Sequence, residues 1–389
     1  MTSLRTRVRA LLHATLTPAP GVPVLPSGPP FAHASGADPY RLLLIGDESV
    51  AGHGVASHDL GPAGWLAREV AELTQHGVDV EVLGLSSLSS PGAEPTLTEQ
   101  RLRRVDAAVL LLNYQDFPHV AASTTDSTRL LVSRLRDHLT AATPIIVVAA
   151  PPLRTSPGSS RLQAFSQRLR SSSAGFCTVD FIDLEDSRGP IHARTPSETY
   201  RSWAKPIAKG LVPRLHAPKQ CGPTDEKVDE AVRQTAVEQL GARDGAWTAR
   251  FDRYVSYIRA AYGTKYAALS VVDEEHTHFA VRYGFDRARM PKLETVCGSA
   301  LLHPCGLLIG NARDDDRFRQ RALVREGLAG FYAGYPVMSR DGHPVGVLCV
   351  FDPSERNVEQ GDIALLRDFA LGVQEELWRP PSAVLPLHR

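Results

Sequence analysis

The sequence has no excess of charge of either sign, because 43 Lys and Arg residues balance 43 Asp and Glu residues over 389 positions. Nucleic acid is therefore not expected as a partner, since proteins that bind it usually carry a basic excess. Long apolar runs are also missing. The longest, residues 107–113 and 145–153, have the length of a strand and fall short of the roughly 20 residues that a membrane span needs. We expect no membrane span.

Cysteine is scarce and scattered. The five cysteines include no C-x-x-C pair, and this usage favours the cytoplasm over a disulfide-rich secreted protein. No group of His, Cys and Asp residues has the spacing of a metal site, so neither a metal nor another cofactor is evident. The apolar residues between Leu4 and Leu12 have helical spacing, which favours a short anchoring helix over a signal peptide.

The sequence does contain enough apolar material for two cores, because 43% of its residues are hydrophobic and its length exceeds that of one ordinary domain. In the first part, apolar runs such as 41–45 and 144–150 alternate with amphipathic stretches such as 60–75. This alternation is typical of βα units around a parallel sheet that is covered on both faces. We expect a helix and a Pro/Gly-rich lead-in over residues 1–39 and a doubly wound α/β domain over 40–216.

The second part has a different pattern. Residues 217–224 hold two prolines, Pro218 and Pro223, and Gly222 without apolar periodicity, which indicates a linker. Short β-rich runs follow, with Asp341-Gly342 as a hairpin signal, and helical patterns stand at both ends. We expect an α+β domain with a mainly antiparallel sheet over residues 225–380 and a tail over 381–389.

A glycine-bearing turn, Gly46-Asp-Glu-Ser-Val-Ala-Gly52, follows the first predicted strand. Turns at the carboxyl edge of a parallel sheet are where ligands bind. This turn resembles the Gly-Asp-Ser block of the SGNH/GDSL hydrolase family, and later segments resemble further family landmarks in the same order: residues 61–68, 106–116, 150–153 and 196–204. The resemblance covers the first domain and implies a flavodoxin-like α/β fold and, as the family's activity, hydrolysis of carboxylic esters.

The family's catalytic positions are substituted in this sequence. In chain order, the residues at or beside them are Glu48, Ser49, Ser87, Gln115, His192 and Thr195. Glu48 stands where the family has its nucleophilic serine and Thr195 where it has its histidine. Because acyl transfer needs a nucleophile, a base and an oxyanion hole, we expect a pseudoenzyme whose first domain is a binding scaffold. The alternative is an esterase or lipase in which Ser49 acts with His192 or His53 in a rearranged site.

The second domain resembles the GAF domain family. The resemblance rests on a hairpin over residues 266–284, the segment Thr295-Val-Cys-Gly-Ser-Ala-Leu301, and the runs Phe331-Tyr-Ala-Gly and Gly346-Val-Leu-Cys-Val-Phe-Asp352. It implies a six-stranded antiparallel sheet with a pocket for an unidentified small-molecule ligand over one face. The candidate pocket residues are Phe279, Cys297, Phe331, Tyr332 and Tyr335. Cys297 stands near a predicted helix start, where a thiol is either activated or simply packed.

These patterns predict a two-domain regulatory protein of signal transduction, in which the GAF-like domain senses a small molecule. The rival function is an esterase regulated by that domain. Apolar stripes on the helices at 225–240 and 359–378 form a bundle either within one chain or between two chains, and we expect a homodimer.

Overall fold

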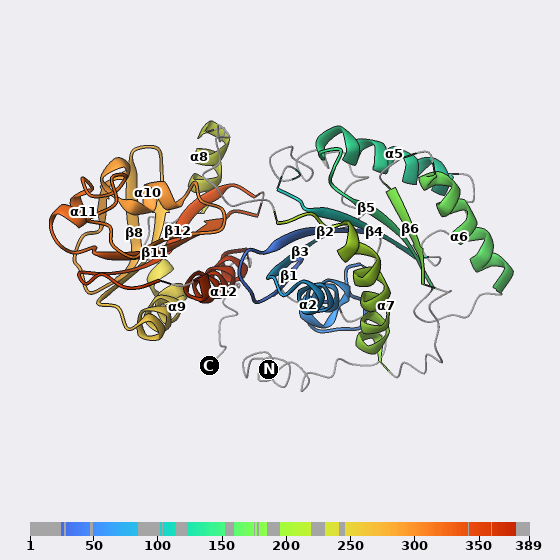
Figure 1. The fold of residues 1–389 in the computed structure, drawn as a ribbon, viewed down its shortest axis with the longest axis horizontal. Coiled ribbons are helices and arrows are strands. Elements are labelled where there is room, and N and C mark those ends of the chain that lie inside the picture. Colours follow the sequence, from blue (N-terminus) through green and yellow to red (C-terminus); the bar gives the residue numbers. More distant parts are fainter. Residues whose placement is uncertain are drawn as a thin grey trace, which may run out of the picture. The chain divides into compact units, whose positions relative to one another are not determined.

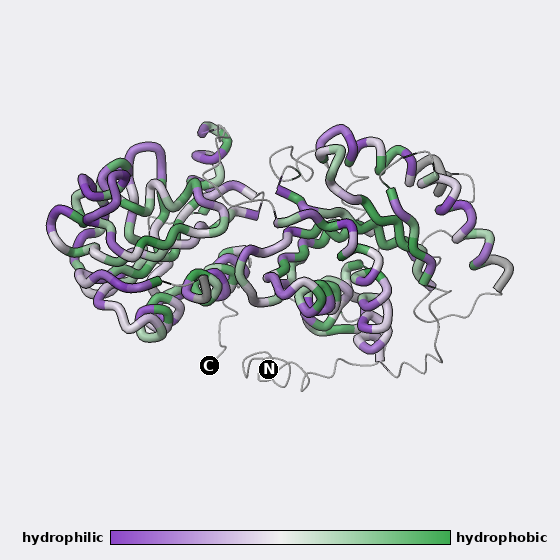
Figure 2. Tube along the Cα trace, in the orientation of Figure 1, coloured by the Kyte–Doolittle hydropathy of each residue, from purple (hydrophilic) through white to green (hydrophobic). Residues whose placement is uncertain are grey.

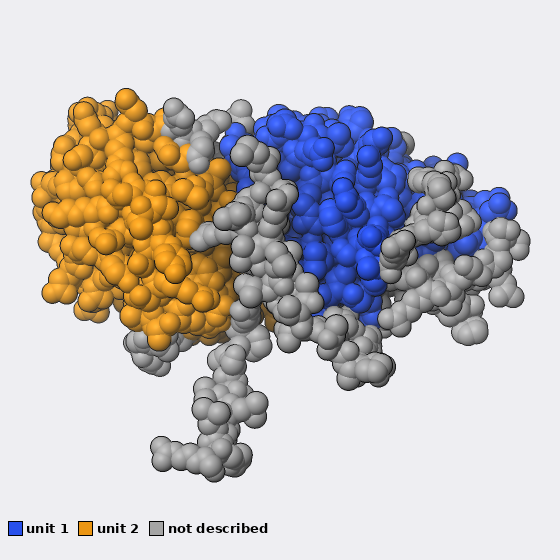
Figure 3. Space-filling view, turned by 90° about the horizontal axis from the view of Figure 1, so that it is seen from below, with its two compact units in different colours: residues 1–219 blue, residues 220–389 orange. Residues whose placement is uncertain are grey.

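The structure is a computed structural model, and it divides into two compact units, Met1–Lys219 and Gln220–Arg389 (Figure 3). The division falls within the segment 217–224, where the sequence predicts a linker. Each unit is described by itself. The residues that the structure describes are 25–26, 29–46, 50–84, 102, 104–113, 123–151, 159–174, 176, 179–184, 195–218, 230–240, 246–340, 342–358 and 360–378.

The first unit is built on a mixed sheet. Its described strands are β1 (Phe31–Ala34), β2 (Tyr40–Gly46), β3 (Val78–Gly84), β4 (Ala107–Asn113), β5 (Ile145–Ala150) and β6 (Val179–Asp183). They lie in the order β1-β3-β2-β4-β5-β6. Strands β2 to β6 are parallel, whereas β1 pairs with β3 in the antiparallel direction. The parallel part has the strand order of flavodoxin-like folds.

Helices cover both faces of this sheet (Figure 1). The described helices are α2 (Pro62–Thr74), α5 (Ser123–His138), α6 (Ser159–Ser173) and α7 (Pro196–Leu211). Helices α2 and α7 contribute to the core on one face, and α5 and α6 to the core on the other. Every residue of β4 and β5 is buried, which explains their uninterrupted apolar sequences and their green colour in Figure 2.

The prediction of a parallel sheet covered on both faces is therefore confirmed for β2 to β6. The antiparallel strand β1 was not predicted, because its four residues Phe-Ala-His-Ala lie in the segment that the sequence presents as a lead-in. The expected helix between Leu4 and Leu12 lies outside the described residues. The two buried faces and the strand order do not by themselves assign the unit to the SGNH hydrolases, since many functions share this fold.

The second unit is built on an antiparallel sheet, as the sequence predicts. Its described strands are β7 (Tyr266–Val272), β8 (His276–Tyr283), β9 (Arg289–Pro291), β10 (Leu307–Ile309), β11 (Phe331–Met338) and β12 (Pro344–Asp352). They lie in the order β10-β11-β12-β7-β8-β9, and all neighbouring pairs are antiparallel. The turn between β11 and β12 contains Gly342 with a φ of 84°, which glycine adopts without strain.

The helices of this unit divide between the two sheet faces. Those described are α8 (Glu230–Gln239), α9 (Ala246–Tyr262), α10 (Val296–Ala300), α11 (Ala322–Arg325) and α12 (Gln360–Trp378). Residues of α8, α9 and α12 share one core with the sheet, and residues of α10 and α11 share the other. We call the face of the sheet that packs against α10 and α11 the α10 face. In the part of the chain that the structure describes, no helix is both long and apolar enough to cross a membrane.

The two helix stripes expected to form a bundle differ in burial. Leu366 and Phe369 of the α12 stripe belong to the core of the unit. On α8, the predicted stripe residues Ala231 and Val232 are exposed, and Val237 packs into the core instead. The homodimer stays a prediction, and light scattering of the full chain at micromolar concentration tests it.

Candidate functional site

Most of the substituted SGNH positions cannot be placed. Glu48, Ser49, Ser87, Gln115 and His192 lie outside the described residues. Only the sixth position is described, and it is structural: Thr195 caps the N-terminus of α7. Its side-chain oxygen accepts a hydrogen bond from the Glu198 N–H at 3.3 Å, and the Glu198 carboxylate accepts one from the Thr195 N–H at 2.9 Å. This is a capping box, in which each side chain satisfies a backbone donor of the first helical turn.

The segment that follows the glycine-bearing turn is tied to two helices. The Tyr200 hydroxyl of α7 donates to the His53 carbonyl at 2.9 Å. The Trp65 indole N–H of α2 donates to the Ser197 hydroxyl at 3.0 Å, and that hydroxyl donates to the Leu60 carbonyl at 2.9 Å. These hydrogen bonds fix residues 53–60, between β2 and α2, at the carboxyl edge of the sheet, where the family resemblance places a site.

One histidine beside this loop is unsuited to act as a cation. His58 is buried, with 9% of its surface exposed, and burial lowers the pKa of its imidazole while Asp59 acts in the opposite direction. Among the described residues, no group of three or more His, Cys, Asp and Glu side chains could hold a metal ion.

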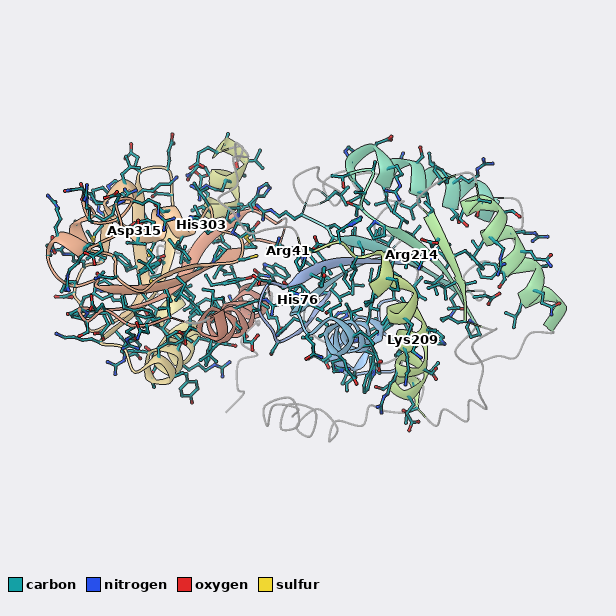
Figure 4. All side chains as sticks on the ribbon, in the orientation of Figure 1. Arg41, His76, Lys209, Arg214, His303 and Asp315 are labelled. Atoms are coloured by element: carbon teal, nitrogen blue, oxygen red, sulfur yellow. The ribbon has the colours of Figure 1, made fainter. Side chains whose placement is uncertain are left out.

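Side chains on the surface of both units are held in local ion pairs. Arg214, just after α7, pairs with Asp180 of β6, and Asp315 pairs with Arg317 in the second unit at 2.7 Å. Figure 4 labels Arg214 and Asp315. Hydrogen bonding to Arg317 lowers the pKa of the Asp315 carboxyl, and burial together with the Arg317 charge lowers that of His303. These exposed pairs are typical of a solvated surface.

The α10 face of the second unit brings together three polar side chains that are buried in an apolar core. Cys297 of α10 has 2% of its surface exposed, Tyr332 of β11 has 2% and Cys349 of β12 has 0%. The Tyr332 hydroxyl donates to the Cys297 sulfur at 3.4 Å, and the two sulfurs are 3.6 Å apart. The phenol ring lies over Gly334, where a Cβ would come within 2.4 Å of the hydroxyl oxygen.

These contacts distinguish the two thiols. The hydrogen bond with Cys349, then those with the Tyr332 and Ser270 hydroxyls, lower the pKa of the Cys297 thiol against the effect of burial. The same contact with Cys297, together with burial, raises the pKa of Cys349. The sequence left open whether a helix start activates Cys297 or the thiol is simply packed; in the structure, side chains of neighbouring strands cause the shift of its pKa. Cys305 takes part in a disulfide bond, which the sequence did not predict.

Phe279 belongs to an aromatic cluster on the same face. Its ring meets that of Phe285 edge-on, with centroids 5.0 Å apart. The Phe351 ring stacks on Tyr266 at 5.0 Å and lies 5.3 Å from Phe285. Tyr266, Phe285 and Phe351 were missed as candidate site residues. Tyr266 and Phe351 each stand in a β-rich run of the sequence, at 266–272 and 344–352, which could have indicated them.

Phe331 and Tyr335 lie on the opposite side of the sheet from Tyr332. Both belong to the core formed with α8, α9 and α12, whereas Tyr332 belongs to the core of the α10 face. The reason is the two-residue period of a strand, which sends positions 331 and 335 to one face and 332 to the other. The structure therefore brings together Phe279, Cys297 and Tyr332 and separates Phe331 and Tyr335 from them.

Comparison with known proteins supports a GAF domain in the second unit, since residues 231–374 match the GAF domain family. A cyclic di-GMP phosphodiesterase of Pseudomonas aeruginosa is 31% identical over 144 residues, which are 36% of this chain and 24% of the relative. The chain thus spans about a quarter of the relative's length. The SGNH resemblance of the first unit stays a prediction.

Solved structures to which this chain is similar include a free methionine-R-sulfoxide reductase from Neisseria meningitidis. It is 18% identical, the match covers 41% of this chain and 96% of the reductase chain, and the TM-score is 0.30. The GAF domain of an Acinetobacter phosphoenolpyruvate-protein phosphotransferase is 14% identical. The match covers 39% of this chain and 94% of the chain of that structure, and the TM-score is 0.29.

Proposed function

We propose that this chain is a regulatory protein of signal transduction whose second unit senses a small molecule. The observation that carries the proposal is the match of residues 231–374 to the GAF domain family. The relative of 31% identity is a cyclic di-GMP phosphodiesterase, and this supports a signalling role. Sensing requires no catalytic group, so the proposed function needs only a part of the second unit that binds a ligand.

The α10 face is the proposed ligand side. It combines the aromatic rings of Phe279 and Phe285 with a polar hydroxyl and two thiols around Cys297, and pockets for small ligands have this mixture of apolar walls and few polar groups. The half-buried ring of Phe285 packs against the core of this face and provides an aromatic edge near its surface. Phe331 and Tyr335 would support the sheet from behind.

Native mass spectrometry of gently purified full chain tests this proposal directly. We expect a small molecule retained at one per chain, or a rise in melting temperature with one member of a panel of nucleotides and metabolites that includes cyclic di-GMP. Phe279→Ala should weaken that binding. Val281→Ala is the matched control, because Val281 lies on the same strand, is equally buried and belongs to the opposite core. Equal loss in both variants, or no binding at all, would contradict the proposal.

For the first unit, we propose a binding scaffold without ester hydrolysis. The capping role of Thr195 supports this, because the position that resembles the family's histidine is engaged with the helix backbone and offers no base. A serine hydroxyl without a base keeps its proton and is a poor nucleophile.

Hydrolysis of p-nitrophenyl acetate and butyrate tests the scaffold. Wild type, Ser49→Ala and Glu48→Ala should all show the buffer rate. Turnover in the wild type that disappears only in Ser49→Ala would instead establish the esterase with a shifted nucleophile. Glu48→Ser should also remain inactive, because Thr195 cannot take the proton.

A further inference from the structure

Cys297 and Cys349 form a pair of free thiols at the centre of the α10 face. They are 52 residues apart in the sequence, yet their sulfurs are separated by 3.6 Å. Cys349 sits in the middle of β12, opposite Gly334 of β11 and Ala268 of β7. Two thiols at this distance can react with one another once one of them is oxidised, because a disulfide forms by attack of one sulfur on the other.

The surroundings assign different roles to the two sulfurs. The Tyr332 hydroxyl donates to the Cys297 sulfur. The lowered pKa of the Cys297 thiol favours the thiolate, which is the form that reacts with electrophiles. Cys349 retains its proton, since its pKa is raised by the same contact and by burial. Cys297 is therefore suited to be the sulfur that reacts first with an oxidant, and Cys349 to be the thiol that then attacks the oxidised Cys297.

We propose that Cys297 is a site of oxidation by hydrogen peroxide and that Cys349 converts the product into an intramolecular disulfide. The two thiols also belong to the proposed ligand side, but the oxidation requires no ligand, so each proposal can fail without the other. Burial restricts the oxidant, because a sulfur on a residue that is only 2% exposed is closed to a peptide disulfide such as oxidised glutathione.

The chemistry balances in two steps. The Cys297 thiolate attacks one peroxide oxygen and the O–O bond breaks. The hydroxide that leaves takes the proton that Cys297 released when it became a thiolate, which gives water, and Cys297 is then a sulfenic acid. The Cys349 sulfur attacks the Cys297 sulfur, the S–O bond breaks, and the hydroxide that leaves takes the Cys349 proton. In total two thiols and one hydrogen peroxide give one disulfide and two waters.

The geometry locates the movement that this requires. A disulfide has its sulfurs about 2.05 Å apart, so the two sulfurs must approach from 3.6 Å. Cys349 is held in the sheet by neighbours on both sides, whereas Cys297 lies on a helix of only five residues. We expect α10 to move toward the sheet and to become covalently joined to β12.

The experiment treats reduced full-length protein with a small molar excess of hydrogen peroxide and maps the peptides under non-reducing conditions. A cross-linked peptide pair containing Cys297 and Cys349 is expected, and reduction should abolish it. Oxidised glutathione should give no adduct at Cys297. The proposal is overturned if both thiols survive peroxide, or if Cys297 pairs with any other cysteine.

Two variants separate a reactive pair from a merely packed one. Cys349→Ser should stop Cys297 at the sulfenic acid, which is trapped by a 1,3-dione after denaturation. Tyr332→Phe should slow oxidation several-fold at neutral pH and move the midpoint of the plot of rate against pH to a higher pH. Each unit by which the pKa of Cys297 rises lowers the thiolate fraction below the midpoint about tenfold. Tyr335→Phe is the matched control, since it removes a hydroxyl from the same strand on the other face. A pH profile that is the same for both tyrosine variants refutes the assigned role of Tyr332.

Discussion

The Glu230–Arg233 pair fixes α8 to the second unit, and removing its carboxylate should weaken that unit measurably. Arg233 has 1% of its side chain exposed, and its guanidinium holds the Glu230 carboxylate through two hydrogen bonds of 2.6 and 2.8 Å. It also donates to the Val272 and Pro344 carbonyls, at the end of β7 and the start of β12. Glu230→Gln leaves this buried cation without its anionic partner.

The magnitude follows from the titration of Glu230. Hydrogen bonds to Arg233 lower the pKa of this carboxyl from 4.5 to about 2, which corresponds to ~3.4 kcal/mol at 1.36 kcal/mol per unit. Because 38% of the Glu230 side chain is exposed, solvent screens part of the interaction, and about half of that figure, ~1.5–2 kcal/mol, is expected. The folded pKa is the lower one, so the stabilisation is complete above pH 4.5 and is lost as the pH falls toward 2.

Hydrogen–deuterium exchange of the full chain measures this effect in one unit at a time. Peptides from β7 report the opening of the second unit, and peptides from β4 report the first unit as an internal reference. Glu230→Gln should accelerate exchange in β7 at pH 7 about tenfold or more and leave β4 unchanged. Glu238→Gln, at an exposed position of the same helix, is the matched control. The reasoning fails if both variants behave alike, or if the difference from wild type is as large at pH 3 as at pH 7.

Three further substitutions test other parts of the structure. Thr195→Val removes the side-chain cap of α7 and should cost about 1 kcal/mol, seen as faster hydrogen exchange in that helix, whereas Thr195→Ser should not. Gly334→Ala places a Cβ 2.4 Å from the Tyr332 hydroxyl, so the phenol must move, and alkylation of the neighbouring Cys297 thiol should then require a higher pH. Phe251→Ala empties a fully buried site in α9 and should lower the unfolding free energy of the second unit by about 3–5 kcal/mol in urea; a loss below 1 kcal/mol would show that the core had collapsed around it.

The sequence was sufficient for the architecture wherever burial forces a pattern. Strands buried on both faces must be apolar throughout, so β4 and β5 could be predicted from their composition alone, and the change to antiparallel pairing in the second unit was visible in its hairpin turn. Strand β1 could not be predicted, because a strand of four residues leaves no periodicity to detect. β1 forms by pairing with β3, and this contact between segments distant in the sequence is visible only in the tertiary structure.

The candidate site was harder to predict for the same reason. All positions of β11 up to Val337 are buried, so hydropathy cannot show which residues face α10, and Tyr332 was grouped with Phe331 and Tyr335 from the other face. The contact of Cys297 with Cys349 joins segments distant in the sequence and has no local signal. The apolar run around Cys349 agrees with its burial, but its neighbour could only be found in three dimensions.

The short strand β1 has a consequence for the handling of the first unit. By pairing with β3 from Phe31↔Glu81 to Ala34↔Val78, it occupies backbone donors and acceptors that would otherwise form an open template for another chain. At the far side of the sheet, β6 carries Asp180 and Asp183, and charged side chains discourage such pairing there. A fragment that starts at Tyr40 would keep the doubly wound core but expose the edge of β3. We expect self-association of that fragment through intermolecular strand pairing, rather than loss of its fold, when β1 is removed with the rest of residues 1–39.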